Sequence, residues 1–234
     1  MLVKRLTLSL VLTASMTPSG GLTASPEVAD EPEFSRANTL LFLDDHLTGP
    51  EHSARYVYST SRTGSQDSDF DDRIIMTAHP VPGSDVKRVA FDLSAENGQT
   101  PVPPVERARG NPMIMVFLQS DVLDLAEATG GHWRYFQKHM KLALEHDARV
   151  EPVIIDFQGK RMEAYQITVQ PYANDQDRRN ELGRYRHKTY EFVLSDELPG
   201  EIFELRSITP AEEESEPPII RQVSLQAFEE LPAK

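Results

Sequence analysis

The fold class follows from the stretch Ala54-Arg55-Tyr56-Val57-Tyr58-Ser59. In it Ala54, Tyr56 and Tyr58 alternate with Arg55, Val57 and Ser59, at a period of two. Successive side chains of a strand point to opposite faces of a sheet, so this period predicts a strand with one covered face. Residues 73–78 and 88–93 repeat the pattern, and Gly64-Ser65 and Pro82-Gly83 stand between the three runs as turn signals. The first half of the chain is therefore expected to form an antiparallel meander.

The middle of the chain predicts two helices. Ser120 is a suitable N-cap residue, and the segment after it ends at Gly130-Gly131. A second helix is expected from about His132, with one apolar stripe formed by Trp133, Phe136, Met140 and Leu144. The apolar run Met113–Leu118 fits either a buried strand or the first turns of the first helix.

The last third returns to the strand pattern. Residues 153–157 and 162–172 flank the turn Gln158-Gly159-Lys160, and further strands are expected at 190–194 and 202–208. Within residues 162–172 the apolar positions change parity, which predicts a bulge near Tyr165. Strand blocks on both sides of a helical segment indicate an α+β fold, with a mostly antiparallel sheet, flat or curved, packed against the two helices.

The N-terminal residues 1–25 have the pattern of a secretory signal peptide. Lys4 and Arg5 precede the apolar stretch Leu6–Met16, and small residues follow it. This stretch is shorter than the roughly 20 apolar residues that span a membrane, and no later stretch is long enough. We therefore expect a periplasmic or secreted protein with no transmembrane segment after signal cleavage.

Composition divides the remainder of the chain into three parts. Residues 26–36 read as an acidic, proline-containing linker, and residues 37–209 as a single α+β domain. Residues 210–234 carry four glutamates followed by Pro217-Pro218, which predicts an acidic, disordered tail. The apolar residues between Ile219 and Phe228 leave open the alternative that part of this tail docks as a strand or helix.

Charge and residue usage exclude several classes of function. The chain carries 37 acidic and 24 basic residues, a formal charge of −13 that becomes −15 without Lys4 and Arg5. Such a chain repels nucleic acid, so no nucleic-acid partner is expected. With no cysteine there is no disulfide, thiol nucleophile or cysteine-ligated metal. Phosphate-loop and dinucleotide motifs are absent from the sequence, and we expect no cofactor.

Two further kinds of chemistry are considered, calcium binding and nucleophilic catalysis. Asp67, Asp69 and Asp71 copy the first ligand spacings of a calcium loop, but Asp72 and Ala78 occupy the positions of its glycine and last glutamate. A solvated acidic turn is therefore preferred to a calcium site. No Gly-x-Ser-x-Gly turn is present, and no catalytic residue is assigned.

Two segments resemble known exported proteins. Residues 110–131, from Gly-Asn-Pro to Gly-Gly, and residues 190–200, which end in Leu-Pro-Gly, resemble an uncharacterised exported family of proteobacteria. The second segment is also similar to the strand–Pro-Gly–strand ending of periplasmic half-barrel proteins related to lipoprotein carriers. That resemblance implies a curved antiparallel sheet wrapped over helices, with an apolar concave face. Glu201 stands where such a turn often continues with glycine, and no functional residue is carried over.

These observations favour a non-catalytic binding protein of the cell envelope, whose partner is an envelope protein or an apolar small molecule. The candidate residues that would line the ligand site are Tyr56, Tyr58, Phe91, Trp133, Phe136 and Met140. For these six residues, a place in the core is preferred to a ligand site. The alternatives are a secreted hydrolase with a carboxylate or Ser/His site, and a structural envelope protein with no ligand. An apolar cavity of at least ~300 Å³ would favour the binding protein.

Overall fold

The computed structural model describes residues 34–48, 52–64, 70–93, 102–176, 178–213 and 215–232, which all belong to one compact unit, Phe34–Lys234. The expected signal peptide, residues 1–25, lies outside the described residues, as do residues 26–33 of the expected linker. Of the linker's last residues, Ser35 already caps a helix that begins at Arg36. Among the described segments, no helix is both long and apolar enough to cross a membrane.

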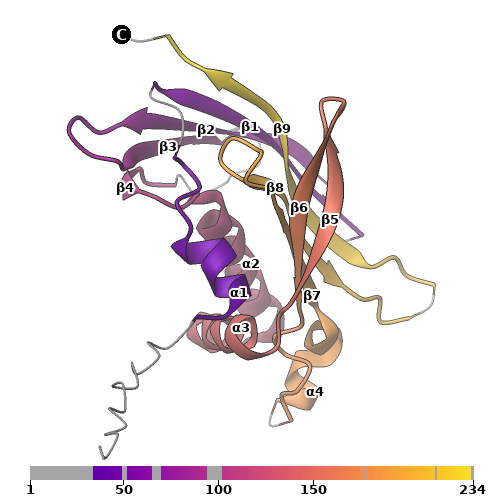
Figure 1. The fold of residues 1–234 in the computed structure, drawn as a ribbon. Coiled ribbons are helices and arrows are strands. Elements are labelled where there is room, and N and C mark those ends of the chain that lie inside the picture. The colour runs from indigo at the N-terminus through magenta and orange to yellow at the C-terminus, as the bar shows by residue number, and fades with distance from the viewer. Residues whose placement is uncertain are drawn as a thin grey trace, which may run out of the picture. The chain divides into compact units, whose positions relative to one another are not determined.

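Nine antiparallel strands form one sheet, in the order β4-β3-β2-β1-β9-β8-β7-β6-β5. The sheet bends around the helices, which lie on one of its faces (Figure 1). This confirms the α+β fold with an antiparallel sheet. The strands are β1 (Ala54–Thr63), β2 (Phe70–Pro80), β3 (Lys87–Leu93), β4 (Val105–Ala108), β5 (Arg149–Phe157), β6 (Lys160–Val169), β7 (Thr189–Leu194), β8 (Ile202–Thr209) and β9 (Ile219–Glu230).

The helical segments are α1 (Arg36–Asn38), which continues into a π-helical turn η1 (Thr39–Leu43), then α2 (Met113–Thr129), α3 (Trp133–His146), α4 (Arg179–Leu182) and a 3₁₀ turn η3 (Gly183–His187). The run Met113–Leu118 is thus the start of α2 and not a strand. Ser120 consequently lies inside the helix, and its predicted role as N-cap is wrong. The first turn is satisfied instead by Asn111, whose side-chain oxygen accepts a hydrogen bond from the Met113 amide at 3.0 Å.

The predicted disordered tail is wrong for residues 219–230. These residues form β9, which lies in the middle of the sheet between β1 and β8. The physical reason is that Val223 and Leu225 are buried in the core, where both neighbouring strands satisfy the backbone of β9. The acidic residues that suggested disorder precede this strand rather than belong to it.

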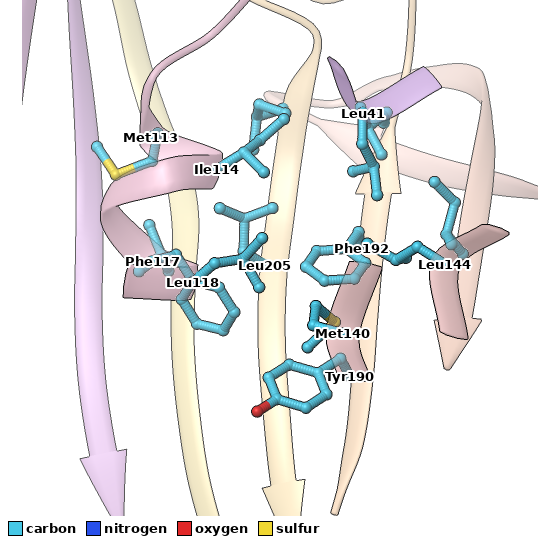
Figure 2. Close-up of a cluster of buried hydrophobic side chains, with 14 of the residues drawn as sticks. Leu41, Met113, Ile114, Phe117, Leu118, Met140, Leu144, Tyr190, Phe192 and Leu205 are labelled. Carbon is cyan, nitrogen blue, oxygen red and sulfur yellow. The ribbon is translucent and has the colours of Figure 1, made fainter. Parts of the chain in front are cut away.

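The core lies between the helices and the face of the sheet that they cover. Side chains of α2 and α3 meet those of β7 and β8, and the space between them is filled by aliphatic and aromatic groups (Figure 2). The Phe117 ring meets the Phe192 ring edge to face, with centroids 6.4 Å apart. The predicted packing of the helix pair on the sheet is therefore present, with the concave side of the sheet closed by helices.

The parity change within β6 does not come from a bulge at Tyr165, because the pairing of β6 with β5 and β7 runs through that residue without a shift. Ile167 and Val169 face the main core, whereas Met162 and Ala164 face the opposite side of the sheet. On that side they form a second, smaller cluster with Ile155 of β5 and with Leu198, which comes from the turn before β8. The parity change therefore marks a strand that enters two cores, one on each face.

Asn111 connects four parts of the fold. Its side-chain amide donates to the Tyr58 hydroxyl at 3.0 Å and to the Gly200 carbonyl at 2.8 Å. Its backbone N–H donates to Nδ1 of His46 at 2.9 Å, and the other ring nitrogen of His46 lies 2.7 Å from the Leu40 carbonyl. Asn111 thus joins the start of α2 to three other parts of the fold: β1, the turn before β8, and residues 40–46.

Candidate functional site

An open groove of about 630 Å³ lies between the N-terminal helical segment α1–η1 and the helices α2 and α3. This volume falls within the range of roughly 300–1,000 Å³ that is typical of small-molecule sites. We call it the apolar groove. Its lining residues are Phe34, Asn38, Phe42, Leu43, Met115, Leu118, Gln119, Val122, Trp133, Arg134, Gln137, Lys138, Met140, Lys141 and Leu144.

Helix α3 contributes two parallel stripes to the groove. Trp133, Gln137, Met140 and Leu144 recur at intervals of four, three and four residues, so they share one face of the helix. Met140 and Leu144 of this stripe are buried and form the floor. The second stripe, which we call the basic row, consists of Arg134, Lys138 and Lys141, which are exposed and border the floor. The guanidinium of Arg134 lies 5.1 Å from the centre of the Trp133 ring.

The opposite wall comes from the N-terminal segment. In the turn η1, Leu40 and Leu41 point into the core, whereas Phe42 and Leu43 remain 39% and 51% exposed. Phe34, which is 58% exposed, extends this wall. Four consecutive apolar residues cover more than one face of a helical turn, so two of them face outward.

The two walls are tied together by polar contacts. The Ser35 hydroxyl donates to the Leu144 carbonyl at 2.9 Å and accepts from the Asn38 amide at 3.1 Å. The side-chain amide of Asn38 donates to the Glu145 carboxylate, which also accepts from the Ser35 N–H. These hydrogen bonds lower the pKa of Glu145. They fix the start of α1 against the last turn of α3 and hold the width of the groove.

The six residues predicted to line a ligand site are divided between two places. Trp133 and Met140 line the apolar groove. Tyr56, Tyr58 and Phe136 are buried in the core, and Phe91 packs against that core from β3. The structure does not bring the six together, because the helices already fill the concave side of the sheet where Tyr56 and Tyr58 point.

The sequence reading missed the outward-facing apolar residues of the groove, Phe34, Phe42, Leu43 and Met115. A signal for three of these four residues was present. The runs Leu40–Leu43 and Met113–Leu118 are unbroken, and a helix that buries one face needs apolar residues at only three or four positions in seven. The surplus positions, here Phe42, Leu43 and Met115, lie on the solvent side.

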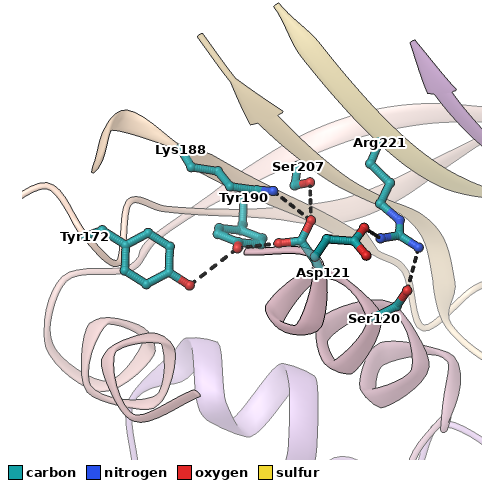
Figure 3. A network of polar contacts seen from close by, with 8 residues as sticks. Ser120, Asp121, Tyr172, Lys188, Tyr190, Ser207 and Arg221 are labelled. Carbon is teal, nitrogen blue, oxygen red and sulfur yellow. Dashed lines mark hydrogen bonds and ion pairs between the residues drawn. The ribbon is translucent and has the colours of Figure 1, made fainter. Parts of the chain in front are cut away.

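A second cluster surrounds Asp121 beneath α2 (Figure 3). Its carboxylate lies 2.7 Å from the Lys188 ammonium and accepts hydrogen bonds from the Tyr190 and Ser207 hydroxyls, at 2.5 and 3.0 Å. Burial raises the pKa of the Asp121 carboxyl, but Lys188 and Tyr190 outweigh it and hold the pKa below its usual range. Both carboxylate oxygens have partners, and the adjoining pocket measures only about 40 Å³. This cluster joins α2 to the sheet and leaves no room for a substrate.

One serine–histidine pair is present. The Ser53 hydroxyl lies 2.9 Å from Nδ1 of His79. Within the described part of the chain, no carboxylate hydrogen-bonds to the other ring nitrogen of His79, so the orienting third group of a catalytic triad is missing.

The proposed calcium ligands fall at a boundary of the described residues. Asp67 and Asp69 lie outside them, and Asp71 lies in β2 opposite Ser61 of β1. In the described ranges there is no group of three or more histidine or carboxylate side chains that could hold a metal ion.

No protein-family profile and no curated protein matches the chain. Among solved structures it is similar to a LolA superfamily protein from Nitrosomonas europaea, at 8% sequence identity and a TM-score of 0.23, over 85% of this chain and 94% of that one. It is also similar to a domain from Vibrio parahaemolyticus described as an outer membrane lipoprotein-sorting protein, at 8% identity and a TM-score of 0.23, over 76% of this chain and 85% of that one. At these values neither protein's function transfers to this chain.

Proposed function

We propose that this chain is a non-catalytic binding protein that holds an apolar ligand in the apolar groove. The observation that carries the proposal is the gathering of exposed apolar side chains at one hollow. Phe34, Phe42, Leu43 and Met115 are each between 39% and 58% exposed, and all four line the same groove. Apolar groups concentrated in this way mark interaction sites, whereas scattered ones are ordinary.

The chemistry of the lining supports binding rather than catalysis. Among the described residues that line the groove there is no carboxylate, histidine or hydroxyl side chain. Its polar groups are the amides of Asn38, Gln119 and Gln137 and the three cations, and these can orient a bound ligand. The ties between Ser35, Asn38 and Glu145 support a groove that exists before the ligand arrives.

The position of the chain's single tryptophan provides the test. Trp133 lines the groove, so its fluorescence should change when dodecyl maltoside binds below its micelle concentration. Replacing Met115 by Gln should weaken this binding about five-fold, because burial of half a methionine side chain stabilises by about 1 kcal/mol. Leu123→Gln is the matched control, since Leu123 lies on the same helix, is 50% exposed against 49% for Met115, and does not line the groove. Absence of saturable binding, or equal weakening by both variants, would overturn the proposal.

Export to the periplasm or the medium is part of the same proposal and rests on the signal-like pattern of residues 1–25. Expression of the full chain in a Gram-negative bacterium, followed by cell fractionation and mass measurement, tests it. A periplasmic product that lacks roughly the first 25 residues is expected. A full-length cytoplasmic product would contradict export without affecting the groove.

A further inference from the structure

The basic row stands out against the charge of the whole chain. With 37 acidic and 24 basic residues, an average surface patch of this protein contains more carboxylates than cations. The apolar groove has the reverse composition: its described lining includes three cations, Arg134, Lys138 and Lys141, and no carboxylate. This local reversal complements a negatively charged ligand group.

Two carboxylates on or beside α3 have partners other than the basic row. Glu145, the acidic residue of α3, accepts hydrogen bonds from Asn38 and Ser35. Asp175 lies on the other side of α3, where it interacts with Tyr135 and His139. Within the described part of the chain, neither Lys138 nor Lys141 has an ion-pair partner at 4.0 Å or less. Their charges are therefore available to a ligand at the groove.

The geometry places this charge directly beside the apolar floor. The basic row follows the stripe Trp133–Gln137–Met140–Leu144 one position later along the same helix. A ligand that lies on the floor can thus contact both the cations of the basic row and the apolar side chains of Phe42 and Leu43, which line the same groove. From Arg134 to Lys141 the row extends about 10.5 Å along the helix axis. This length suits one small ligand. A protein interface is much larger, since it buries roughly 800 Å² on each partner.

We propose that the groove binds a single-chain amphiphile with an anionic head group, whose apolar chain lies on the floor and whose head group contacts the basic row. This inference rests on the proposed function and specifies the class of its ligand. Arg134 is held beside the Trp133 ring, so its charge is already oriented toward the groove. Lys138 and Lys141 add two flexible cations that follow the head group.

The test compares two probes of equal chain length, dodecyl phosphate and dodecyl maltoside, both below their micelle concentrations and read by Trp133 fluorescence. Dodecyl phosphate should bind the full chain more tightly, and its advantage should shrink as ionic strength rises from about 0.01 to 0.5 M. The double variant Lys138→Gln/Lys141→Gln should weaken dodecyl phosphate about five-fold and leave dodecyl maltoside unchanged, as expected for two partly exposed charge contacts.

The matched control is Arg107→Gln/Arg161→Gln, which changes the net charge equally at exposed positions outside the groove. It should leave both affinities unchanged. Equal binding of the two probes, or equal losses in the two double variants, would overturn the anionic ligand while the proposed function stands. Failure of both probes to bind would instead overturn the proposed function. Tighter competition by an acidic amphipathic peptide than by dodecyl phosphate would overturn the choice of a small amphiphile.

Discussion

The ammonium nitrogen of Lys188 lies 2.7 Å from a carboxylate oxygen of Asp121, and both side chains are almost fully buried, at 8% and 2% exposed. A second pair, Arg109 and Asp85, has the same 2.7 Å separation but is at least half exposed. The two pairs therefore differ in their surroundings and not in their distance. In the buried pair each charge depends on the other, because both side chains are largely withdrawn from solvent.

Replacing Asp121 by Asn should lower the free energy of unfolding by about 3–5 kcal/mol, since it leaves the Lys188 charge buried without its partner. Urea denaturation at pH 7 measures this loss. Asp85→Asn is the matched control and should leave the free energy of unfolding nearly unchanged, because solvent screens its pair. Similar losses in the two variants would show that the Asp121 cluster does not join α2 to the sheet.

Acid should destabilise the fold through His46. Burial lowers the pKa of His46, and Nδ1 accepts the Asn111 N–H, so the neutral ring donates from Nε2 to the Leu40 carbonyl. A lowered histidine pKa means that the unfolded chain binds more protons below about pH 6.5, so this contribution to stability is lost as the pH falls. The slope from this one group reaches at most about 1.4 kcal/mol per pH unit.

Unfolding measured between pH 7.5 and 5 should show a smaller slope in His46→Asn, which keeps an acceptor near the Asn111 N–H but does not titrate. His52→Asn, at an exposed histidine, should keep the slope of the unchanged chain. An identical slope in the two variants would rule out His46 as the source.

Glu201 should have the opposite effect on the pH dependence of stability: its contribution to stability is lost as the pH rises. Burial raises its pKa to about 7, and the charges of Asp44 and Asp196 add to this rise. The folded chain therefore holds this proton more tightly than the unfolded chain, so its contribution is complete below about pH 4.5 and is lost as the pH rises through 7. Glu201→Gln should be more stable than the unchanged chain at pH 8 and equally stable at pH 4, measured by thermal unfolding.

Glu197, four residues earlier in the same turn, provides a control of opposite sign. Hydrogen bonds from the Glu163 N–H and from Lys160 lower its pKa. Glu197→Gln should therefore not gain stability at pH 8. A gain in both variants would indicate general relief of negative charge instead of the burial of Glu201.

A side chain at Gly200 should destabilise the fold more than one at a glycine with free space around it. Its φ of +76° is in the left-handed region, and a Cβ there would lie 2.7 Å from the Tyr56 ring and 3.2 Å from the Asn111 amide nitrogen. Gly159 has a similar φ of +81° with nothing within 4 Å of its Cβ position. Gly159→Ala should cost about 1–2 kcal/mol from the backbone alone. Gly200→Ala should cost about 2 kcal/mol more, because it also displaces Tyr56 or Asn111. Equal costs in urea denaturation would show that the turn moves freely.

Most individual strands could be predicted, because alternation is a local property. The residues Tyr56 and Tyr58 are buried as their spacing indicates, and the Gln158–Gly159 turn joins β5 to β6. The place of β9 could not be predicted in the same way. Val223 pairs with Thr60 of β1, which is more than 160 positions earlier, and no local pattern reports such a pairing.

The candidate site, too, could be predicted only in part. The stripe of α3 containing Trp133 and Met140 was visible as a helical period, and both residues line the groove. Phe42 and Met115 are apolar residues like their neighbours Leu41 and Ile114, yet only the latter two are buried. Which of them remained exposed depended on how α1–η1, α2 and α3 pack against one another.

The sequence by itself determined the antiparallel α+β fold, the helix pair and the excess of acidic residues, since period, turn residues and charge are properties of neighbouring positions. Only the tertiary structure decided that the last strand lies in the middle of the sheet, that the concave face is filled, and that three cations and four exposed apolar side chains meet at one groove. The physical reason is that burial depends on contacts between residues far apart in the chain, which a local pattern does not contain.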